Sequence, residues 1–349
     1  MKNILILGVN GFIGHHLSKY ILAHTDWNIY GMDLQSERVS GMLGSPRFHF
    51  VEGDITINLE WVEYHVRKCD VILPLVAIAT PATYVREPLR VFELDFEANL
   101  PIIRHCVKYK KRVVFPSTSE VYGACKDKEF DPETSDLVLG PIHKQRWIYS
   151  CVKQLLDRII YAYGQQGLQF TLFRPFNWIG SGLDSMDDSK EGSSRVLTQF
   201  LGHIVRGEPI KLVDGGAQTR AFTFIDDAVD CLTRVLANPN GIADGKIYNI
   251  GNPANLYSIR ELANMMLEIA RSRPEYAAAA RKTQLVEVTS GDYYGKGYAD
   301  IPARLPSIKN TTAELGWKPS TDMRTALNSI FDAYAHALPS ASALLSRDA

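Results

Sequence analysis

Two side chains that could do chemistry together, Tyr149 and Lys153, lie four residues apart. In a helix this spacing places both on one face, where the lysine ammonium favours the phenolate of a tyrosine whose pKa is ordinarily about 10. A phenolate held in this way could take a proton from a substrate hydroxyl as a general base. A pair of this kind also arises by chance in long chains, so its interpretation depends on the elements around it.

Three polar residues, Thr118, Ser119 and Glu120, follow the apolar run 113–115. This pattern predicts a buried strand of a parallel sheet that ends just before them. Residues at the carboxyl ends of such strands face the edge of the sheet where ligands bind. We therefore expect these three side chains to reach the same crevice as the tyrosine and the lysine.

A glycine-rich turn lies near the amino terminus. The apolar run 3–7 leads directly into it, and residues 15–22 after it have the pattern of an amphipathic helix. Gly8 allows a tight turn, Gly11 allows the backbone to approach a pyrophosphate, and Gly14 lets the helix pack on the strand. The amino terminus of the helix also favours an anion. The pattern predicts a dinucleotide site made by Gly8, Asn10, Gly11, Phe12, Ile13 and Gly14.

Asp33 follows the second predicted strand, residues 27–32, about 20 residues beyond the glycines. Its carboxylate could accept hydrogen bonds from the adenosine ribose hydroxyls and would repel a 2′-phosphate. Leu34 and Gln35 offer no arginine to hold such a phosphate, although Arg38 is near. These residues favour NAD over NADP as the cofactor.

The next two predicted strands, 48–51 and 71–76, lead into loops that could also contact the cofactor. Asp54 and Ile55 could hold an adenine, although an exposed loop acid is an equally good interpretation of Asp54. The loop 77–81 is made of small residues, could pass beneath the cofactor and contains Pro81, which stops the strand. Asn99 could be a surface amide or could hold a backbone carbonyl or a water. The additional cofactor contacts that we expect are Asp54, Ile55, Leu75, Ala77 and Asn99, with Tyr149 and Lys153.

After Lys153 the pattern of the chain changes. A strand at 169–174 is followed by the segment 181–192, which is rich in Ser, Asp and Gly and is typical of a mobile loop over a site. The segment 218–223 is expected to bring Arg220 back towards the sheet. The other elements expected are a helix from 195 to 205, strands at 210–213 and 247–250, a helix at 258–272, and loops at 293–298 and 304–307 that suit a base ring and phosphates.

These elements predict an α/β fold, a doubly wound parallel Rossmann sheet with a smaller, discontinuous α/β substrate domain. We expect residues 1–176 and about 219–252 to bind NAD, about 177–218 and 253–338 to bind the substrate, and 339–349 to form a disordered tail. The helices expected at 93–109 and 149–163 have more apolar surface than one sheet contact needs. This surface predicts a homodimer through a helix bundle.

The composition disfavours several other kinds of partner and site. The formal net charge is -1 and the basic residues are scattered, which disfavours nucleic acid or an anionic membrane as a partner. No apolar run is long enough to cross a membrane, and the chain enters a strand without a signal sequence, so we expect a cytoplasmic protein with a small-molecule substrate. The five cysteines are widely spaced, without a CxxC pair, which favours reduced thiols over disulfides or a metal site. Cys151 lies between Tyr149 and Lys153 but points in another direction on the helix, which disfavours a nucleophilic role.

With the glycine turn, Asp33, Ser119, Tyr149 and Lys153 in hand, the sequence resembles the extended short-chain dehydrogenase/reductase family that modifies nucleotide sugars, over nearly its whole length. Within that family it is most similar to the ArnA-type UDP-glucuronic acid decarboxylases, which are the decarboxylase half of the bifunctional polymyxin-resistance enzymes. The segments that carry this similarity are LPLVAIATP, VFELDFE, FPSTSEVYG, PFNW, GSSR, DGG, IGNP and YYGKGY. Because the glycine motif begins at residue 8, we expect no formyltransferase part.

The resemblance implies roles for individual residues. It implies that Tyr149 is the base, with Lys153 as its partner. It also implies that Ser119 or Thr118 binds the C4 hydroxyl of the sugar. It implies that Glu120, Arg195 and Arg304 act in decarboxylation and clamp the substrate, and we expect Glu120 and Arg304 to lie in a wet crevice. A plain salt bridge between distant segments is the alternative for these two. The substrate contacts implied are Tyr84, Asn177, Arg195, Lys211, Arg220 near the phosphates, Tyr298 on the uracil, and Arg304.

The reaction implied begins with oxidation at C4, after which the 4-keto sugar loses its C6 carboxylate as CO2 to give UDP-4-keto-pentose. The pair Ser119-Glu120 favours this branch of the family. Ser181-Gly182 departs from the Pro-Arg of the relatives, so the lid contacts do not carry over. The alternatives are a UDP-xylose synthase that returns the hydride to C4, a C4 epimerase or dehydratase, and a non-enzymatic NAD-sensing scaffold.

Overall fold

The computed structural model describes residues 1–184, 195–294, 301 and 303–335. A seven-stranded sheet with the strand order β11-β6-β5-β4-β1-β2-β3 forms its larger part, and all neighbouring strands are parallel. The order reverses between β1 and β4, which makes the sheet doubly wound and confirms the predicted fold class. The strands are β1 Asn3–Leu7, β2 Asn28–Asp33, β3 Phe48–Glu52, β4 Val71–Pro74, β5 Arg112–Pro116, β6 Phe170–Pro175 and β11 Lys246–Ile250.

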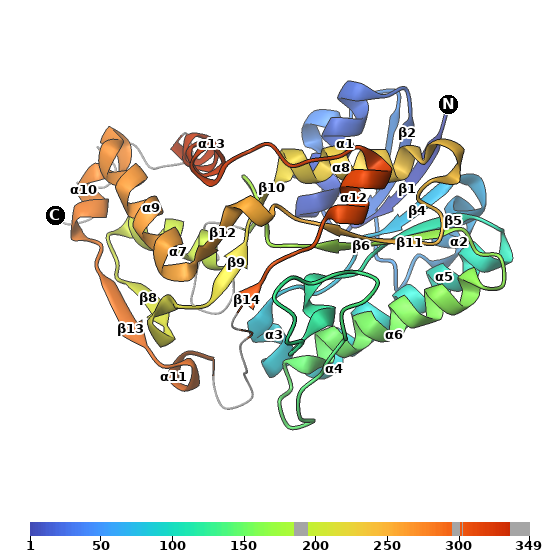
Figure 1. Cartoon of the computed structure of the whole chain (residues 1–349). Helices are drawn as coiled ribbons and strands as arrows, with labels where there is room; N and C mark the ends of the chain where they lie inside the picture. The colour runs from blue at the N-terminus through green and yellow to red at the C-terminus, as the bar shows by residue number, and fades with distance from the viewer. Residues whose placement is uncertain (185–194, 295–300, 302, 336–349) are drawn as a thin grey trace.

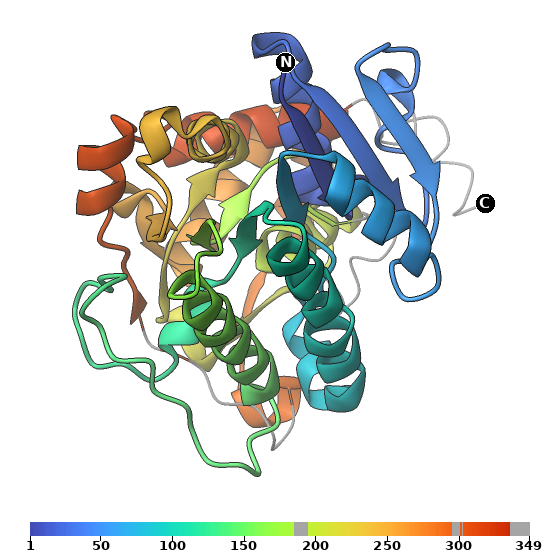
Figure 2. The same ribbon diagram turned by 90° about the vertical axis from the view of Figure 1, so that its right-hand side faces the viewer.

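Helices cover both faces of this sheet, which is why its strands are continuous apolar runs rather than alternating ones. Apolar residues of α1 Phe12–His24 and α8 Ile225–Ala237 pack on one face. Those of α2 Leu59–Lys68, α5 Asn99–Lys108 and α6 Trp147–Gly164 pack on the other. α5 and α6 lie side by side in both views of the molecule (Figure 1 and Figure 2).

Three expected boundaries were wrong. Helix α1 begins at Phe12 rather than at residue 15, directly behind the glycine turn. Strand β4 ends at Pro74, and Pro81 begins the short helix α3 Pro81–Arg86 instead of stopping a strand. The helix expected at 93–109 begins earlier, as α4 Pro88–Phe92, and passes through a π-helical turn, Glu93–Glu97, before α5.

The remaining elements form smaller sheets and a group of helices beside the carboxyl ends of the large sheet (Figure 1). The strand β9 Thr219–Ala221 pairs with β12 Leu256–Ser258 and β14 Ala303–Arg304. Arg220 therefore belongs to this small sheet and does not return to the large one. The other elements are β7 Trp178–Ile179 with β10 Thr223–Phe224, β8 Ile210–Val213 with β13 Leu285–Val288, α7 Val196–Arg206, α9 Ile259–Ser272, α10 Pro274–Lys282, α11 Ser290–Tyr294, α12 Lys309–Leu315 and α13 Met323–Ala335, with 3₁₀ turns at Ser40–Met42, Ser119–Tyr122, Asp214–Gly216, Pro239–Gly241 and Pro253–Asn255.

The three expected loops need correction or lie partly outside the described residues. Tyr293 is in helix α11 rather than in a loop, and Arg304 is in strand β14. Most of the loop expected at 181–192, the residue Tyr298 and the expected tail at 339–349 lie outside the described residues. The division into an NAD-binding and a substrate-binding domain stays a prediction. Among the described helices, none combines the length and the apolar character that a membrane span requires.

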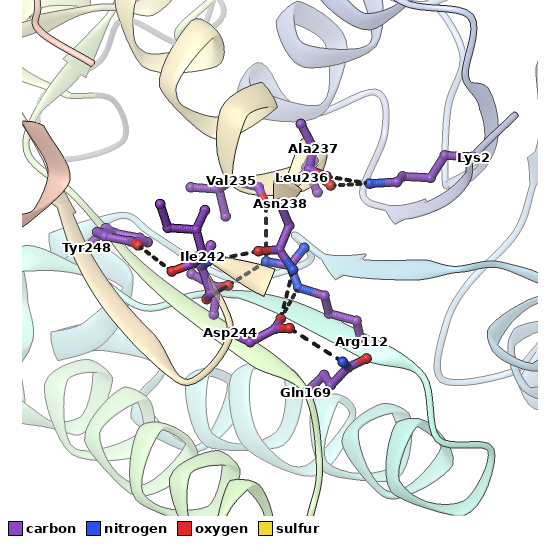
Figure 3. A network of polar contacts seen from close by, with 12 residues as sticks. Lys2, Arg112, Gln169, Val235, Leu236, Ala237, Asn238, Ile242, Asp244 and Tyr248 are labelled. Carbon is purple, nitrogen blue, oxygen red and sulfur yellow. Dashed lines mark hydrogen bonds and ion pairs between the residues drawn. The ribbon is translucent and has the colours of Figure 1, made fainter. Parts of the chain in front are cut away.

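A network of polar contacts lies at the amino ends of the strands of the large sheet (Figure 3). Arg112, the first residue of β5, donates from Nε to Asp244 Oδ1 over 2.9 Å and from Nη2 to the carbonyl oxygen of Val235 over 3.0 Å. Asn238 Nδ2 donates to the same Asp244 oxygen. Lys2, just before β1, donates to the carbonyls of Leu236 and Ala237. These bonds tie the loop after α8 to the sheet at the edge opposite the predicted site.

Candidate active site

The glycine turn has the geometry that a dinucleotide site requires. Gly8 has a φ of +86°, in the left-handed region that favours glycine. A Cβ at Gly14 would lie 2.5 Å from the carbonyl oxygen of Gly8, so only glycine allows α1 to pack this closely on the turn. Since α1 begins at Phe12, the turn runs straight into the amino end of the helix, where free N–H groups favour a phosphate. The residues present therefore fit the pyrophosphate of NAD.

Asp33 links the end of β2 to this turn. Its Oδ2 accepts a hydrogen bond from the backbone N–H of Asn10 over 2.8 Å, and its Oδ1 accepts one from Leu34 N–H over 2.8 Å. Burial raises the pKa of Asp33, while the hydrogen bonds from the backbone oppose that change. The side chain of Asn10 accepts hydrogen bonds from Arg38 N–H and Val39 N–H, which shapes the segment after β2. Asp33 thus lies where the prediction requires a carboxylate.

The other expected adenine contacts have local roles. Asp54 Oδ1 accepts hydrogen bonds from the backbone N–H and the hydroxyl of Thr56, which lower the pKa of Asp54. Ile55 is buried in the core that also contains Met32. Both residues belong to the turn after β3, so they remain at the predicted edge of the sheet.

The loop 75–80 is held by hydrogen bonds with the π-helical turn and with the first residue of α5. Leu75 N–H donates to Leu7 O, and Ala77 is partly exposed. Asn99 is 1% exposed and its Nδ2 donates to the carbonyl oxygen of Val76 over 3.1 Å. Asn99 is therefore a buried amide that holds a backbone carbonyl, not a surface amide. Asp95, which our sequence analysis did not single out, accepts a hydrogen bond from Ile78 N–H over 2.7 Å.

Tyr149 and Lys153 lie on α6, as predicted, but their electrostatics differ from the expectation. Lys153 Nζ donates to the carbonyl oxygen of Pro116 over 3.0 Å and lies 6.0 Å from the centroid of the Tyr149 ring. Burial, then Asp95 and Glu120, raise the pKa of Tyr149 well above its ordinary value, while a hydrogen bond with Thr118 opposes them. The pKa of Tyr149 is therefore raised rather than lowered in this structure, first by burial and then by the two carboxylates.

Glu120 lies between two arginines. It belongs to the 3₁₀ turn after β5, and Thr118 Oγ1 caps that turn by accepting the N–H of Glu120. Arg304 Nη2 is 2.8 Å from Glu120 Oε1, and Arg146 forms an ion pair with Oε2. Burial alone would raise the pKa of Glu120, but Arg146, Arg304 and Arg220 together lower it to about 2. Glu120 is therefore ionised at neutral pH.

The arginine cluster is more enclosed than we expected. The side chains of Glu120, Arg146 and Arg304 are 12%, 1% and 7% exposed, so they form a buried ion cluster rather than groups in a wet crevice. Arg146 was missed by the sequence analysis. It lies three residues before Tyr149 and seven before Lys153, a spacing that places all three near one face of a helix and could have revealed it.

A cavity of about 180 Å³ opens beside this cluster. Six of the residues predicted to act on the substrate line its wall, namely Glu120, Asn177, Arg195, Lys211, Arg220 and Arg304. Strand pairing explains part of this arrangement, because Arg304 and Arg220 are partners in β14 and β9. Gln199 and Tyr293, which also line the cavity, were not predicted, and the Tyr293 hydroxyl donates to Gln199 Oε1 over 2.6 Å.

Three predicted residues have contacts that the sequence analysis did not expect. Tyr84 is 2% exposed and stacks on Tyr149, with ring centroids 4.6 Å apart, so it supports the base rather than lining the cavity. Arg195 lines the cavity but forms an ion pair with Asp184 over 2.7 Å. Ser119 is 4% exposed in the turn that carries Glu120.

Comparison with known proteins agrees with this geometry. The model of the family described as "NAD dependent epimerase/dehydratase family" matches residues 4–251. The chain belongs to this family. The match spans the glycine turn, Asp33, Tyr149 and Lys153, and NAD, the predicted cofactor, is the cofactor of the family.

Three solved structures illustrate the range of the epimerase/dehydratase relatives. PbgP3 from Burkholderia pseudomallei is 63% identical, with a TM-score of 0.89 and 97% of each chain covered. A mutant UDP-glucuronic acid 4-epimerase from Bacillus cereus, in complex with a fluorinated UDP-glucuronic acid and NAD, is 19% identical, with a TM-score of 0.79 and 97% of this chain and 100% of that chain covered. MoeE5 in complex with UDP-glucuronic acid and NAD is 20% identical, with a TM-score of 0.76, and the match covers 96% of this chain and 100% of that chain. The last two likenesses show a shared fold.

Proposed function

We propose that this enzyme catalyses the NAD-dependent oxidative decarboxylation of UDP-glucuronic acid to UDP-4-keto-pentose and CO2. The observation that carries the proposal is the cluster of Arg146 and Arg304 around Glu120, in which Glu120 and Arg304 line the cavity. Arg304 therefore presents a guanidinium group at the cavity wall, close to the other cationic lining residues Arg195, Lys211 and Arg220. Arginine forks suit a second carboxylate, such as the C6 carboxylate of a hexuronic acid.

Further support comes from the likenesses. The B. cereus epimerase and MoeE5 share the fold and were solved with UDP-glucuronic acid or its fluorinated analogue. The similarity of the Ser119-Glu120 segment to ArnA-type decarboxylases points from this substrate to decarboxylation. Arg220, Lys211 and Asn177 line the cavity and are suited to the nucleotide part of such a substrate.

The first step is oxidation at C4. A C4 hydroxyl beside Thr118 and Tyr149 could give its proton to the tyrosine oxygen once that oxygen is ionised, and Thr118 is among the groups that favour the ionised form. NAD, when bound, supplies the hydride acceptor and a positively charged ring. Lys153, held by the carbonyl of Pro116, keeps a second positive charge near the phenol. Tyr84 fixes the orientation of the Tyr149 ring by stacking on it.

The second step is the loss of CO2. In the 4-keto sugar the C6 carboxylate is β to a ketone, so the C5–C6 bond can break and its electron pair can move to the C4 oxygen as an enolate. C5 then takes a proton. Arg304, which lines the cavity, is placed to bind the carboxylate and to stabilise the negative charge that develops, while the buried Arg146 holds Glu120 in position. Because its pKa is about 2, Glu120 acts as an anion that holds the two arginines rather than as a proton donor.

We further propose the assembly and the division of labour that the sequence suggested. Residues 1–176 and about 219–252 would hold NAD, and about 177–218 with 253–338 the UDP-sugar. Leu155 and Tyr161 on α6 are 45% and 50% exposed, which supports a homodimer through the helices around α5 and α6. Five unpaired cysteines and a dependence on NAD favour the cytoplasm.

The test is to identify the product formed from UDP-glucuronic acid and NAD by NMR and mass spectrometry, with NADH counted by absorbance. UDP-glucose, which has no carboxylate, is the matched control substrate. The proposal predicts a decarboxylated 4-keto pentose with one NADH for each product molecule. UDP-xylose without net NADH would instead assign a UDP-xylose synthase. A C4-epimerised uronic acid that keeps its carboxylate would refute decarboxylation.

A further inference from the structure

Asp95 is a buried acid that the proposed chemistry has not used. It lies in the π-helical turn Glu93–Glu97 and its side chain is 0% exposed. Turns of this kind, inserted into a longer helix, are frequent at functional sites. Burial of a carboxylate is costly unless its oxygens are satisfied, so each oxygen of Asp95 needs an explanation.

The two oxygens of Asp95 have different surroundings. Oδ1 accepts the backbone N–H of Ile78 over 2.7 Å, which fixes the loop 75–80. Oδ2 has no hydrogen-bond partner among the described residues. Asn99, one turn further on, donates to the carbonyl oxygens of Val76, Leu94 and Asp95, so the backbone groups loosened by the π-helical turn are held by the amide and not by the acid.

The residues next to the Asp95 carboxylate pack against the catalytic tyrosine: Ile78, whose N–H Asp95 accepts, and Phe96 both contact the cluster of Tyr84 and Tyr149. The charge of Asp95 therefore lies close to the Tyr149–Lys153 pair. After burial, Asp95 is the strongest influence that raises the pKa of Tyr149, and it also opposes the lowering of the pKa of Lys153. The pKa of Tyr84 on α3 is raised mainly by burial, with smaller contributions from Tyr149, Glu120 and Asp95. Burial raises the pKa of Asp95 itself to about 6, with Lys153 opposing. The other charges that face the pair are Glu120 and Arg195 for Tyr149 and Asp157 for Lys153, and Arg195 opposes the two acids at Tyr149.

We propose that Asp95 is a positioning residue that sets the charge state of the Tyr149–Lys153 pair, while it anchors the loop 75–80 through Ile78. Its negative charge keeps Lys153 protonated and delays ionisation of Tyr149. The inference rests on the proposed oxidation step, but it holds for any nucleotide sugar that this pair oxidises. It does not depend on loss of CO2.

Two substitutions separate the two functions of Asp95. Asp95→Asn keeps an oxygen that can accept the Ile78 N–H but removes the charge. Asp95→Ala removes both. Glu97→Gln is the matched control, because Glu97 is an exposed acid on the same turn.

The measurement is the pH profile of NADH formation with UDP-glucuronic acid, and CO2 release is followed separately. Without the charge of Asp95, the ionisations of Tyr149 and Lys153 both move to lower pH. Asp95→Asn should therefore shift the whole pH profile down by about one pH unit. On the acid limb its rate of NADH formation should be roughly tenfold higher than that of the wild type. Glu97→Gln should leave the profile in place. Asp95→Ser serves if the asparagine variant fails to fold, with the same expected shift.

An unchanged profile in a folded charge-free variant would overturn this inference and leave Asp95 as a purely structural anchor. Normal NADH formation without CO2 release in the wild type would contradict the proposed function alone. Asp95→Ala should in addition weaken NAD binding, because the loop 75–80 loses its hydrogen bond. A profile shift confined to Asp95→Ala would also contradict the proposal.

Discussion

The two edges of the large sheet both bury an arginine against an acid, but they do so in different ways. At the amino edge Arg112 meets Asp244, one cation to one anion, and Thr171 and Val235 accept its other hydrogen bonds (Figure 3). At the carboxyl edge two arginines share Glu120, and Glu120 and Arg304 line a cavity. The Arg112–Asp244 pair joins parts of the fold away from the cavity, whereas a guanidinium group at a cavity wall is suited to bind the carboxylate of a ligand.

The largest effect should come from the carboxyl edge. Tyr149→Phe keeps the ring that stacks on Tyr84 and removes the oxygen that takes the proton. NADH formation should fall by about 10^2- to 10^4-fold, with unchanged circular dichroism and nearly unchanged unfolding. Near-normal NADH formation would mean that Tyr149 is structural.

Removing one arginine from each edge tests the comparison directly. Arg304→Met should reduce CO2 release by a factor that corresponds to about 3 kcal/mol or more, because the substrate carboxylate and the enolate lose a cation. The unfolding free energy should fall by less than the ~3 kcal/mol expected when a buried charge loses its partner, since Glu120 keeps Arg146. The measurements are labelled CO2 release and urea unfolding.

Arg112→Met is the matched control, and its effects should be reversed. Asp244 would lose its cation in a partly buried position, which should cost about 3 kcal/mol of unfolding free energy. CO2 release per folded molecule should stay at the wild-type level. Equal losses of activity in both variants would end the distinction between the two edges.

The pH dependence of the unfolding free energy tests whether the arginines at the carboxyl edge hold Glu120 ionised. The pKa of Glu120 is lowered from 4.5 to about 2, so its contribution to stability is present above pH 4.5 and is lost as the pH falls towards 2. Between pH 5 and pH 3 the stability advantage of the wild type over Glu120→Gln should shrink by roughly 2 kcal/mol. A constant difference over this range would show that the arginines do not hold Glu120 ionised. Glu120→Gln should also release CO2 slowly.

The smallest effect concerns the cofactor. Asp33→Asn should weaken NAD binding about tenfold and reduce the preference for NAD over NADP, since the ribose hydroxyls lose a charged acceptor. Fluorescence titration with both dinucleotides measures this. Glu52→Gln, on the neighbouring strand opposite Asp33, should leave NAD affinity unchanged. Tighter binding of NADP than of NAD by the wild type would contradict the role given to Asp33.

The amino-terminal half could be predicted closely because its signals are local. The glycine turn, Asp33, and the pair Tyr149 and Lys153 are each contained in one strand, turn or helix, so spacing alone places them. Boundaries were less certain, as at Pro81, because a proline can end one element or begin the next.

The charged cavity could be predicted only in part. Glu120, Arg220 and Arg304 come from segments far apart in the chain, and their meeting depends on the small sheet that pairs β9 with β14. The resemblance supplied these three residues, but it did not supply Arg146 or Asp95. The signals for the last two were present. Arg146 lies three residues before Tyr149, and Asp95 lies four residues from both Val91 and Asn99, on the helix face that also carries the apolar residues Ile102 and Ile103. The electrostatics of Tyr149 could not be read from spacing, because burial and nearby carboxylates outweigh Lys153.

The most direct test of the central claim is the release of labelled CO2 from carboxyl-labelled UDP-glucuronic acid by the wild-type enzyme with NAD, measured beside Arg304→Met and Arg112→Met. The account predicts CO2 release that requires NAD, that is lost with Arg304 and that is retained per folded molecule with the Arg112 substitution. Absence of CO2 release from the wild type while NADH forms, or wild-type release by folded Arg304→Met, would contradict the assignment of the arginine cluster to decarboxylation.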